Sequence, residues 1–122
     1  MSLKRQRLGK EGENRCVQFL SQEGYRILER NWRCRFGEID FVARQGQTLA
    51  FIEVKTRENL TYGEPQESVN WRKQRKIIAV ALCYLRFQKT ENQPIRFDVI
   101  AVTPEKIEIF PNAFQPESRY SI

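Results

Sequence analysis

Apolar and polar residues alternate in two neighbouring segments of the chain, 37–43 and 48–55. A period of two is typical of β-strands, because successive side chains of a strand point to opposite faces. Gln45-Gly46 lies between the two segments, and a glycine in such a short connection favours a tight turn. The pattern therefore predicts a β-hairpin.

Apolar residues follow a helical period in two other segments. The first is 8–23, where Val17 and Leu20 share one face and Gly24 supplies a stop signal. The second is 67–88, which is basic in its first half and apolar in its second half. Both segments are predicted to form helices that pack on a sheet.

The remaining segments complete a mixed layout of helices and strands. Segments 25–31, 95–102 and 106–110 are predicted to be further strands, and 32–36 and 57–65 to be connections. The order predicts an α/β fold with a central mixed β-sheet of about five strands flanked by helices. A length of 122 residues fits a single domain, 1–122, with a core over about 8–110 and a loosely held tail over 111–122.

Polar side chains interrupt the apolar pattern of the predicted hairpin. By alternation, Asp40 and Val42 share a face of the first strand, and Ile39 lies on the other face. Glu53 and Lys55 share a face of the second strand. A loop of even length puts Asp40, Glu53 and Lys55 on one face of the hairpin, whereas an odd loop or a bulge separates them.

The length of the loop also decides which residues lie opposite each other. A two-residue turn at Gln45-Gly46 puts Asp40 opposite Phe51, and a four-residue loop, 45–48, puts it opposite Glu53. Cβ atoms of directly opposed residues lie about 4.5–5.5 Å apart, and those of diagonal neighbours about 7–8 Å. Two carboxylates at such separations can reach one divalent ion, and oxygen ligands favour Mg²⁺ or Mn²⁺.

The alternative for Glu53 and Lys55 is that both are simply exposed strand residues. The second strand is apolar on both faces, however, so a carboxylate there is costly unless a cation meets it, which favours a site. Glu13 adds a third acid on the apolar stripe of the first helix, four residues before Val17. Its alternative role is to contact the helix N-terminus or a nearby arginine.

Composition and charge limit the kinds of ligand and the classes of catalytic site that the chain can have. The formal net charge is +6 and the pI is about 9.5, which favours a polyanionic partner such as nucleic acid. The chain has no histidine, so histidine-containing triads, histidine-based nucleases and histidine–zinc hydrolases are excluded. The three cysteines are widely spaced, which predicts free thiols in a cytoplasmic protein. No apolar run reaches about 18 residues, so no membrane partner is expected.

Five short blocks of the sequence resemble the YraN family, small bacterial proteins described as predicted endonucleases. The blocks are Gly12-Glu13, Gly24-Tyr25-Arg26-Ile27-Leu28, Arg30-Asn31-Trp32-Arg33, Gly37-Glu38-Ile39-Asp40 and Glu53-Val54-Lys55-Thr56-Arg57. The family is similar to archaeal Holliday-junction resolvases and to the restriction-endonuclease-like superfamily. The resemblance therefore implies a restriction-endonuclease-like fold and a metal-dependent nuclease that acts on DNA rather than RNA, including branched or structured DNA.

The resemblance also implies a role for each candidate residue. Asp40 and Glu53 would bind Mg²⁺ or Mn²⁺ together with the carbonyl oxygen of Val54. Lys55 would be the catalytic lysine. Glu13 matches an acid on the first helix of the resolvases, which implies a part in catalysis and metal binding. The resolvases further imply a homodimer.

Basic residues around the second predicted helix are candidates for phosphate contacts: Arg57, Arg72, Lys73 and Lys76. Gln74 is a further candidate, because a glutamine of this helix contributes to some nuclease sites. The helix N-terminus near Glu67 would add its dipole. Two rival interpretations stay open: a nucleic-acid-binding module of the same fold without catalysis, and a protein-interaction domain whose charges only cover the surface.

Overall fold

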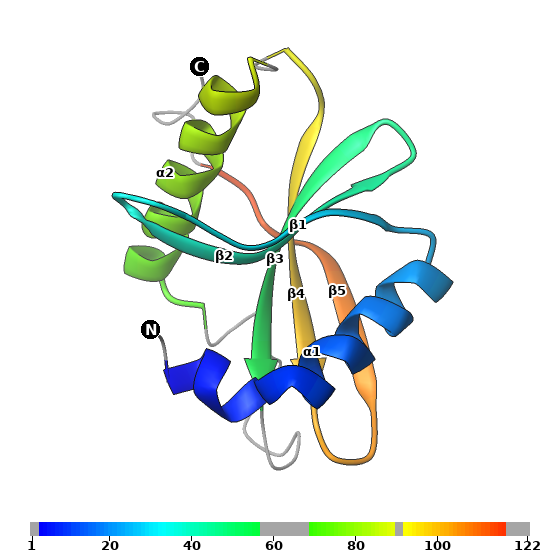
Figure 1. The fold of residues 1–122 in the computed structure, drawn as a ribbon. Coiled ribbons are helices and arrows are strands. Elements are labelled where there is room, and N and C mark those ends of the chain that lie inside the picture. The colour runs from blue at the N-terminus through cyan, green and yellow to red at the C-terminus, as the bar shows by residue number, and fades with distance from the viewer. Residues whose placement is uncertain (1–2, 57–68, 90–91, 117–122) are drawn as a thin grey trace.

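The computed structural model describes residues 3–56, 69–89 and 92–116 (Figure 1). The elements in chain order are α1 (Leu3–Gln22), β1 (Arg26–Cys34), β2 (Gly37–Gln45), β3 (Thr48–Thr56), α2 (Trp71–Gln88), β4 (Ile95–Val102) and β5 (Ile107–Phe114). The predicted connection 57–65, with the candidate Arg57, lies outside the described residues, as does Glu67.

The five strands form one sheet in the order β1-β2-β3-β4-β5. All neighbours are antiparallel except β3 and β4, which run parallel. Parallel neighbours need a long crossover connection, and α2 lies in the chain between them. The predicted α/β fold, with a mixed sheet of five strands flanked by helices, is confirmed.

Side chains of β3 alternate between two apolar layers, one on each face of the sheet. Leu49 and Phe51 belong to the core under α2, whereas Ala50, Ile52 and Val54 belong to the core under α1. The helices therefore cover opposite faces, and Figure 1 shows α1 crossing the sheet near the C-terminal ends of β3 and β4. The predicted burial of this strand on both sides is confirmed. Neither described helix is long and apolar enough to cross a membrane.

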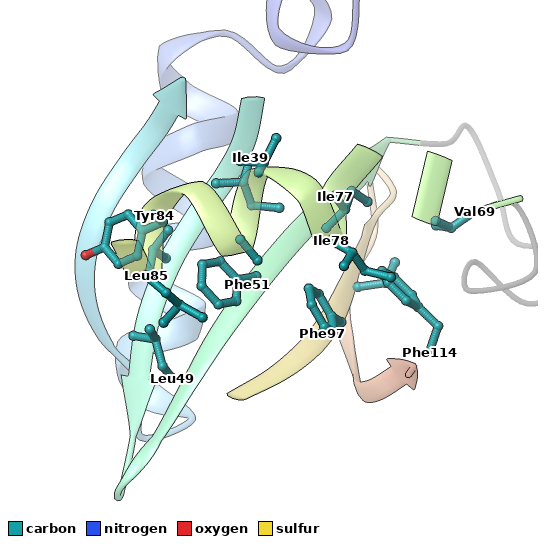
Figure 2. Close-up of a cluster of buried hydrophobic side chains, with 14 residues drawn as sticks. Ile39, Leu49, Phe51, Val69, Ile77, Ile78, Tyr84, Leu85, Phe97 and Phe114 are labelled. Carbon is teal, nitrogen blue, oxygen red and sulfur yellow. The ribbon is translucent and has the colours of Figure 1, made fainter. Parts of the chain in front are cut away.

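Aromatic rings form the centre of the core under α2. Figure 2 shows Tyr84 of α2 close to Phe51 of β3, and their ring centroids are 5.8 Å apart in an edge-on contact. Phe97 stacks on Phe51 at 5.8 Å and on Phe114 at 5.1 Å. Such pairs contribute about 0.5–1.5 kcal/mol each beyond the burial of area. This packing fixes α2 on the sheet and, with it, the residues that the helix presents beside β3.

β1 is longer than predicted and includes the start of the segment expected to be a connection, 32–36. Trp32 and Cys34 pack against the core under α2, and Arg33 between them is exposed, so the alternation of a strand continues. Arg33 also pairs with Glu38 directly opposite on β2, with Nε 3.1 Å from Oε2. The prediction of a connection is therefore wrong for the first three residues of that segment.

α2 begins later than predicted. Asn70 is its N-cap, because the Asn70 side chain accepts a hydrogen bond of 2.9 Å from the backbone N–H of Lys73. Val69, the residue before the cap, is buried in the core under α2, which fixes the point where the chain enters the helix. The predicted start at Glu67 is too early, since the helix begins at Trp71.

β5 continues past the predicted end of the core. A register shift in its pairing with β4 lies beside Asp98, and Asn112 has a positive φ of 55°. The backbone N–H of Asn112 donates to Asp98 Oδ1 at 2.8 Å, and the ring of Phe114 stacks on Phe97. These contacts hold 111–114 on the sheet, where the sequence predicts a loose tail.

Candidate active site

The hairpin of β2 and β3 has a turn of two residues, Gly46 and Gln47, because Gln45 pairs with Thr48. Gly46 has a φ of 60°, in the left-handed region that suits glycine. The turn lies one position later than the predicted Gln45-Gly46. The resulting register is the one that the sequence predicts for a four-residue loop. Continued past the pair Phe41 and Ile52, it puts Asp40 opposite Glu53.

Asp40 and Glu53 lie where the two strands separate. Backbone pairing ends at Phe41 and Ile52, one residue before the acids. The backbone N–H of Val54 donates to Asp40 Oδ2 at 2.7 Å, so the carboxylate satisfies a backbone donor at the end of the paired region. Only 3% of Asp40 and 4% of Glu53 are exposed. Burial of two carboxylates is costly unless cations or hydrogen bonds compensate it.

The predicted alternation of β2 breaks down beside Asp40. Ile39 and Val42 pack in the same core under α2, although alternation puts them on opposite faces, and Phe41 packs under α1. The alternation of β2 is therefore interrupted at Asp40, which lies between Ile39 in one layer and Phe41 in the other. The negative charge of Asp40 also affects Cys16 of α1. Burial, and then the Asp40 carboxylate, raise the pKa of the Cys16 thiol to about 12.

Lys73, in the first turn of α2, supplies a cation for these acids. Its Nζ lies 2.9 Å from Glu53 Oε2, and the two side chains are 37% and 6% exposed. Partial burial opposes the charge of the ammonium group, but the carboxylates of Glu53 and Asp40 outweigh it, so the pKa of Lys73 is raised. Lys73 also contacts the Lys55 side chain. The structure thus brings Asp40, Glu53 and Lys55 together, with Lys73 as a fourth member.

Glu13 of α1 contacts two residues of β1. Asn31 Nδ2 donates to its Oε1 at 3.4 Å, and Arg30 Nη1 is 3.9 Å from the same oxygen; both partners belong to β1. The contact with a nearby arginine is the alternative role that the sequence left open. Within the described ranges, no group of three or more His, Cys, Asp or Glu side chains could hold a metal ion. The structure therefore does not bring Glu13 to Asp40 and Glu53 as a third ligand.

The remaining candidates of α2 have different surroundings. Arg72 and Lys76 are exposed and can meet a large ligand on the surface. Gln74 instead donates from Nε2 to the carbonyl oxygen of Val69 at 2.8 Å. That bond braces the start of the helix, so Gln74 is engaged locally.

Most of the chain, residues 12–102, matches the sequence model of the family described as "Uncharacterised protein family UPF0102". The chain belongs to UPF0102. UPF0102 proteins from Geobacter metallireducens and Thermodesulfovibrio yellowstonii are each 49% identical to it, over 94% and 88% of this chain and 98% and 95% of theirs. A UPF0102 protein from Syntrophus aciditrophicus is 47% identical over 89% of both chains. This membership confirms the resemblance to the YraN family.

The UPF0102 chain has another buried acid that the sequence did not single out, Asp98 of β4. Its Oδ1 accepts from Arg96 Nε at 2.9 Å and from the Asn112 N–H at 2.8 Å, and its Oδ2 accepts from the Tyr25 hydroxyl at 2.8 Å. Burial and the Asp98 carboxylate raise the pKa of Tyr25. These bonds tie β4 to β5 and to the segment after α1, which is a structural role. Its signal in the sequence is an acid inside an apolar strand.

Asp40 and Glu53 of this UPF0102 protein could supply oxygen ligands to a divalent metal ion. Asp40 and Glu53 supply hard anionic oxygens, and the chain has no histidine to offer a softer nitrogen ligand. Proteins commonly hold Mg²⁺ with one or two carboxylates, and waters and substrate phosphates complete its coordination. The donor set therefore suits Mg²⁺ or Mn²⁺ better than zinc.

Proposed function

We propose that this UPF0102 protein is a magnesium- or manganese-dependent nuclease that hydrolyses phosphodiester bonds in DNA, including branched or structured DNA. The proposal is carried by the pair of buried carboxylates, Asp40 and Glu53, beside the side chains of Lys55 and Lys73. Buried acids that face specific cations are concentrated at catalytic sites. The resemblance to resolvases, whose sites have an acid followed by an acid-x-lysine element, supports the same conclusion.

Each residue has a role that follows from its chemistry. Asp40 and Glu53 would hold the metal ion, which when bound acidifies water and offsets the negative charge of the scissile phosphate. Lys55 would donate a hydrogen bond to a phosphate oxygen and stabilise the charge that develops on it. Lys73 holds the Glu53 carboxylate in position through their ion pair of 2.9 Å. The reaction places the hydroxyl of water on phosphorus and a proton on the leaving oxygen.

Cleavage assays test the proposal. Four-way junctions, flaps, single strands and duplexes of DNA, with RNA in parallel, are incubated with the parent protein and Mg²⁺ or Mn²⁺. Asp40→Ala, Glu53→Ala and Lys55→Ala should each lower the cleavage rate by about 100-fold or more, as removal of one charged transition-state contact does. Glu13→Ala should have a smaller effect. Glu108→Ala, which removes an acid from a surface ion pair of β5, is the matched control and should keep the parent rate.

The three site variants must be folded for this comparison, and circular dichroism checks that they are. Cleavage that persists undiminished in all three would show that the proposed site is wrong. If the parent protein cleaves none of these substrates, the proposed nuclease function itself is contradicted.

A nucleic-acid-binding module without catalysis is the second candidate function. Two observations favour it: Lys73 already pairs with Glu53, and within the described part of the chain no three acids surround a metal position. A metal titration separates the candidates. The nuclease predicts that Mg²⁺ or Mn²⁺ raises the Tm of the parent more than that of Glu53→Gln, because a bound ligand stabilises the folded state. A module that binds no metal gives equal shifts for both proteins.

The proposed setting is the cytoplasm. Cys16, Cys34 and Cys83 are free thiols, as is usual in a reducing compartment. The resolvase analogy further supports a homodimer, since two sites related by a two-fold axis can cut two strands symmetrically. Light scattering separates such a dimer from the 14.5 kDa monomer.

A further inference from the structure

Two shallow hollows lie next to each other between the tip of the β1–β2 hairpin and the outer face of α2. Each has a volume of about 440 Å³, and they share Arg35, Phe36 and Ala79. The other lining residues are Arg72, Arg75 and Lys76 in one hollow, and Leu82, Cys83 and Arg86 in the other. We refer to this combined surface as the tip groove.

The charge of the tip groove has one sign. Five basic side chains line it and no acidic one does, as far as the described residues go: Arg35, Arg72, Arg75, Lys76 and Arg86. All five are exposed. From Arg72 to Arg86 the helix rises about 21 Å, at 1.5 Å per residue, which is long enough for several phosphates of one strand. The groove is therefore complementary to an extended polyanion.

Two exposed aromatic rings lie at the tip groove: Phe36 lines it, and Trp71 contacts Arg75, which lines it. Phe36 is 45% exposed at the hairpin tip, and Trp71 is 46% exposed at the start of α2. The guanidinium of Arg35 lies 4.9 Å from the centroid of Phe36, and that of Arg75 lies 4.7 Å from the centroid of Trp71. Aromatic rings and planar guanidinium groups are the side chains on which unstacked nucleobases stack. The groove thus offers flat stacking faces as well as positive charge.

The tip groove adjoins the candidate active site through α2. Lys76, which lines the groove, follows Lys73 by three residues, and such neighbours have Cβ atoms about 5–6 Å apart on a helix. Lys73 in turn contacts Glu53 at 2.9 Å. A strand that lies in the groove would therefore pass beside the two buried carboxylates.

We propose that the tip groove binds an unpaired strand of DNA, with phosphates on its basic residues and bases stacked on Phe36 and Trp71. A duplex presents phosphates too, but it keeps the faces of its bases stacked inside, so only an unpaired strand can use the rings. The proposal deepens the proposed nuclease function and rests on it. The substrate would be DNA in which a single strand leaves a duplex.

Equilibrium binding in the presence of EDTA tests the groove without cleavage. Fluorescence anisotropy compares a labelled oligothymidine with a duplex of the same length, and the parent should prefer the single strand by about tenfold. Phe36→Leu and Trp71→Leu keep apolar bulk but remove a stacking face. Each should weaken single-strand binding about tenfold and leave duplex binding unchanged. Arg75→Ala should weaken the binding of both forms, since phosphates are common to both.

Two variants serve as matched controls. Phe87→Leu removes a ring that is 71% exposed on the same helix and whose aromatic neighbour is Trp32, which does not line the groove. It should bind both forms as the parent does. Arg26→Ala removes one positive charge at the other end of β1, about 25 Å along the strand from the hairpin tip. It should weaken binding less than Arg75→Ala.

The proposal would be overturned if the parent bound single-stranded and duplex DNA with equal affinity. It would also be overturned if Phe36→Leu and Trp71→Leu both bound single strands as tightly as Phe87→Leu does. These outcomes are independent of cleavage. A parent that prefers single strands but never cuts DNA contradicts the nuclease function and leaves the groove assignment standing. A parent that cuts DNA but binds both forms equally contradicts the groove assignment alone.

Discussion

Replacement of Lys73 by methionine removes the ammonium group that lies 2.9 Å from Glu53 Oε2 and keeps most of the apolar stem. The Glu53 carboxylate then stays buried, with 6% of its side chain exposed, after losing this cation. Breaking a fully buried ion pair in this way costs about 3–5 kcal/mol, whereas an exposed pair contributes about 0.2–1 kcal/mol. Because the Lys73 side chain is 37% exposed, water screens part of the attraction. We expect the free energy of unfolding to fall by about 2 kcal/mol.

A double-mutant cycle separates the ion pair from other effects of the substitution. Glu53→Gln and the double variant Glu53→Gln/Lys73→Met complete the cycle, and urea unfolding gives the free energy of each protein. The double variant lacks both members of the pair, so its loss should be smaller than the two single losses added together, by about 1 kcal/mol or more. Lys76→Met, an exposed position on the same helix, is the control and should change stability by less than about 0.5 kcal/mol.

A Lys73→Met protein as stable as the Lys76→Met control would contradict the predicted loss of stability. Strictly additive losses around the cycle would contradict it as well. Either result would mean that the Glu53 carboxylate does not depend on Lys73, and the electrostatic description of the candidate site would be wrong.

Two further predictions concern other buried groups. Asp98→Asn should lower the free energy of unfolding by about 3 kcal/mol, because it removes the charge that faces Arg96 in a buried network, whereas Glu108→Gln on the surface should cost less than about 1 kcal/mol. Urea unfolding measures both, and equal losses would contradict the prediction. Cys16→Ala tests alkaline stability: burial and the Asp40 carboxylate raise the thiol pKa from 9.0 to about 12 on folding, so the unfolded chain ionises first as pH rises. Between about pH 8 and pH 10 the parent should lose about 1 kcal/mol of stability that Cys16→Ala does not lose, and an equal pH dependence of stability in the two proteins would contradict this.

The central strands are predictable because their local pattern and their burial agree. β3 is apolar on both faces and lies inside the sheet, and the observed bounds of β4 are those predicted, 95–102. The edge strands are different. The end of β1 depends on the pairing of Arg33 with Glu38, and the end of β5 depends on the bond from Asn112 to Asp98. Asn112 and Asp98 lie far apart in the sequence, so no local window contains both, and the end of β5 could not be predicted.

The proximity of the candidate acids could be predicted from the sequence, because it requires only a hairpin with a loop of even length. The ion pair between Lys73 and Glu53 could not, because it depends on how α2 docks across the sheet. The position of Ile39 in the core under α2 could not be predicted either, because it departs from the alternation of the strand. For Glu13 the sequence left two roles open, and its contacts with Arg30 and Asn31 depend on the position of β1, which no local pattern specifies.

The hydrogen bond of 2.7 Å from the Val54 N–H to Asp40 Oδ2 gives the molecule a spectroscopic reporter. An ionised carboxylate is a stronger acceptor than a neutral group, and a strong acceptor moves an amide proton resonance downfield. A proton or a metal ion on Asp40 draws charge away from that oxygen, so the Val54 resonance should move upfield while the fold stays the same. One backbone signal in a nitrogen-edited NMR spectrum would then follow the charge of Asp40 during a titration, in the absence of any substrate.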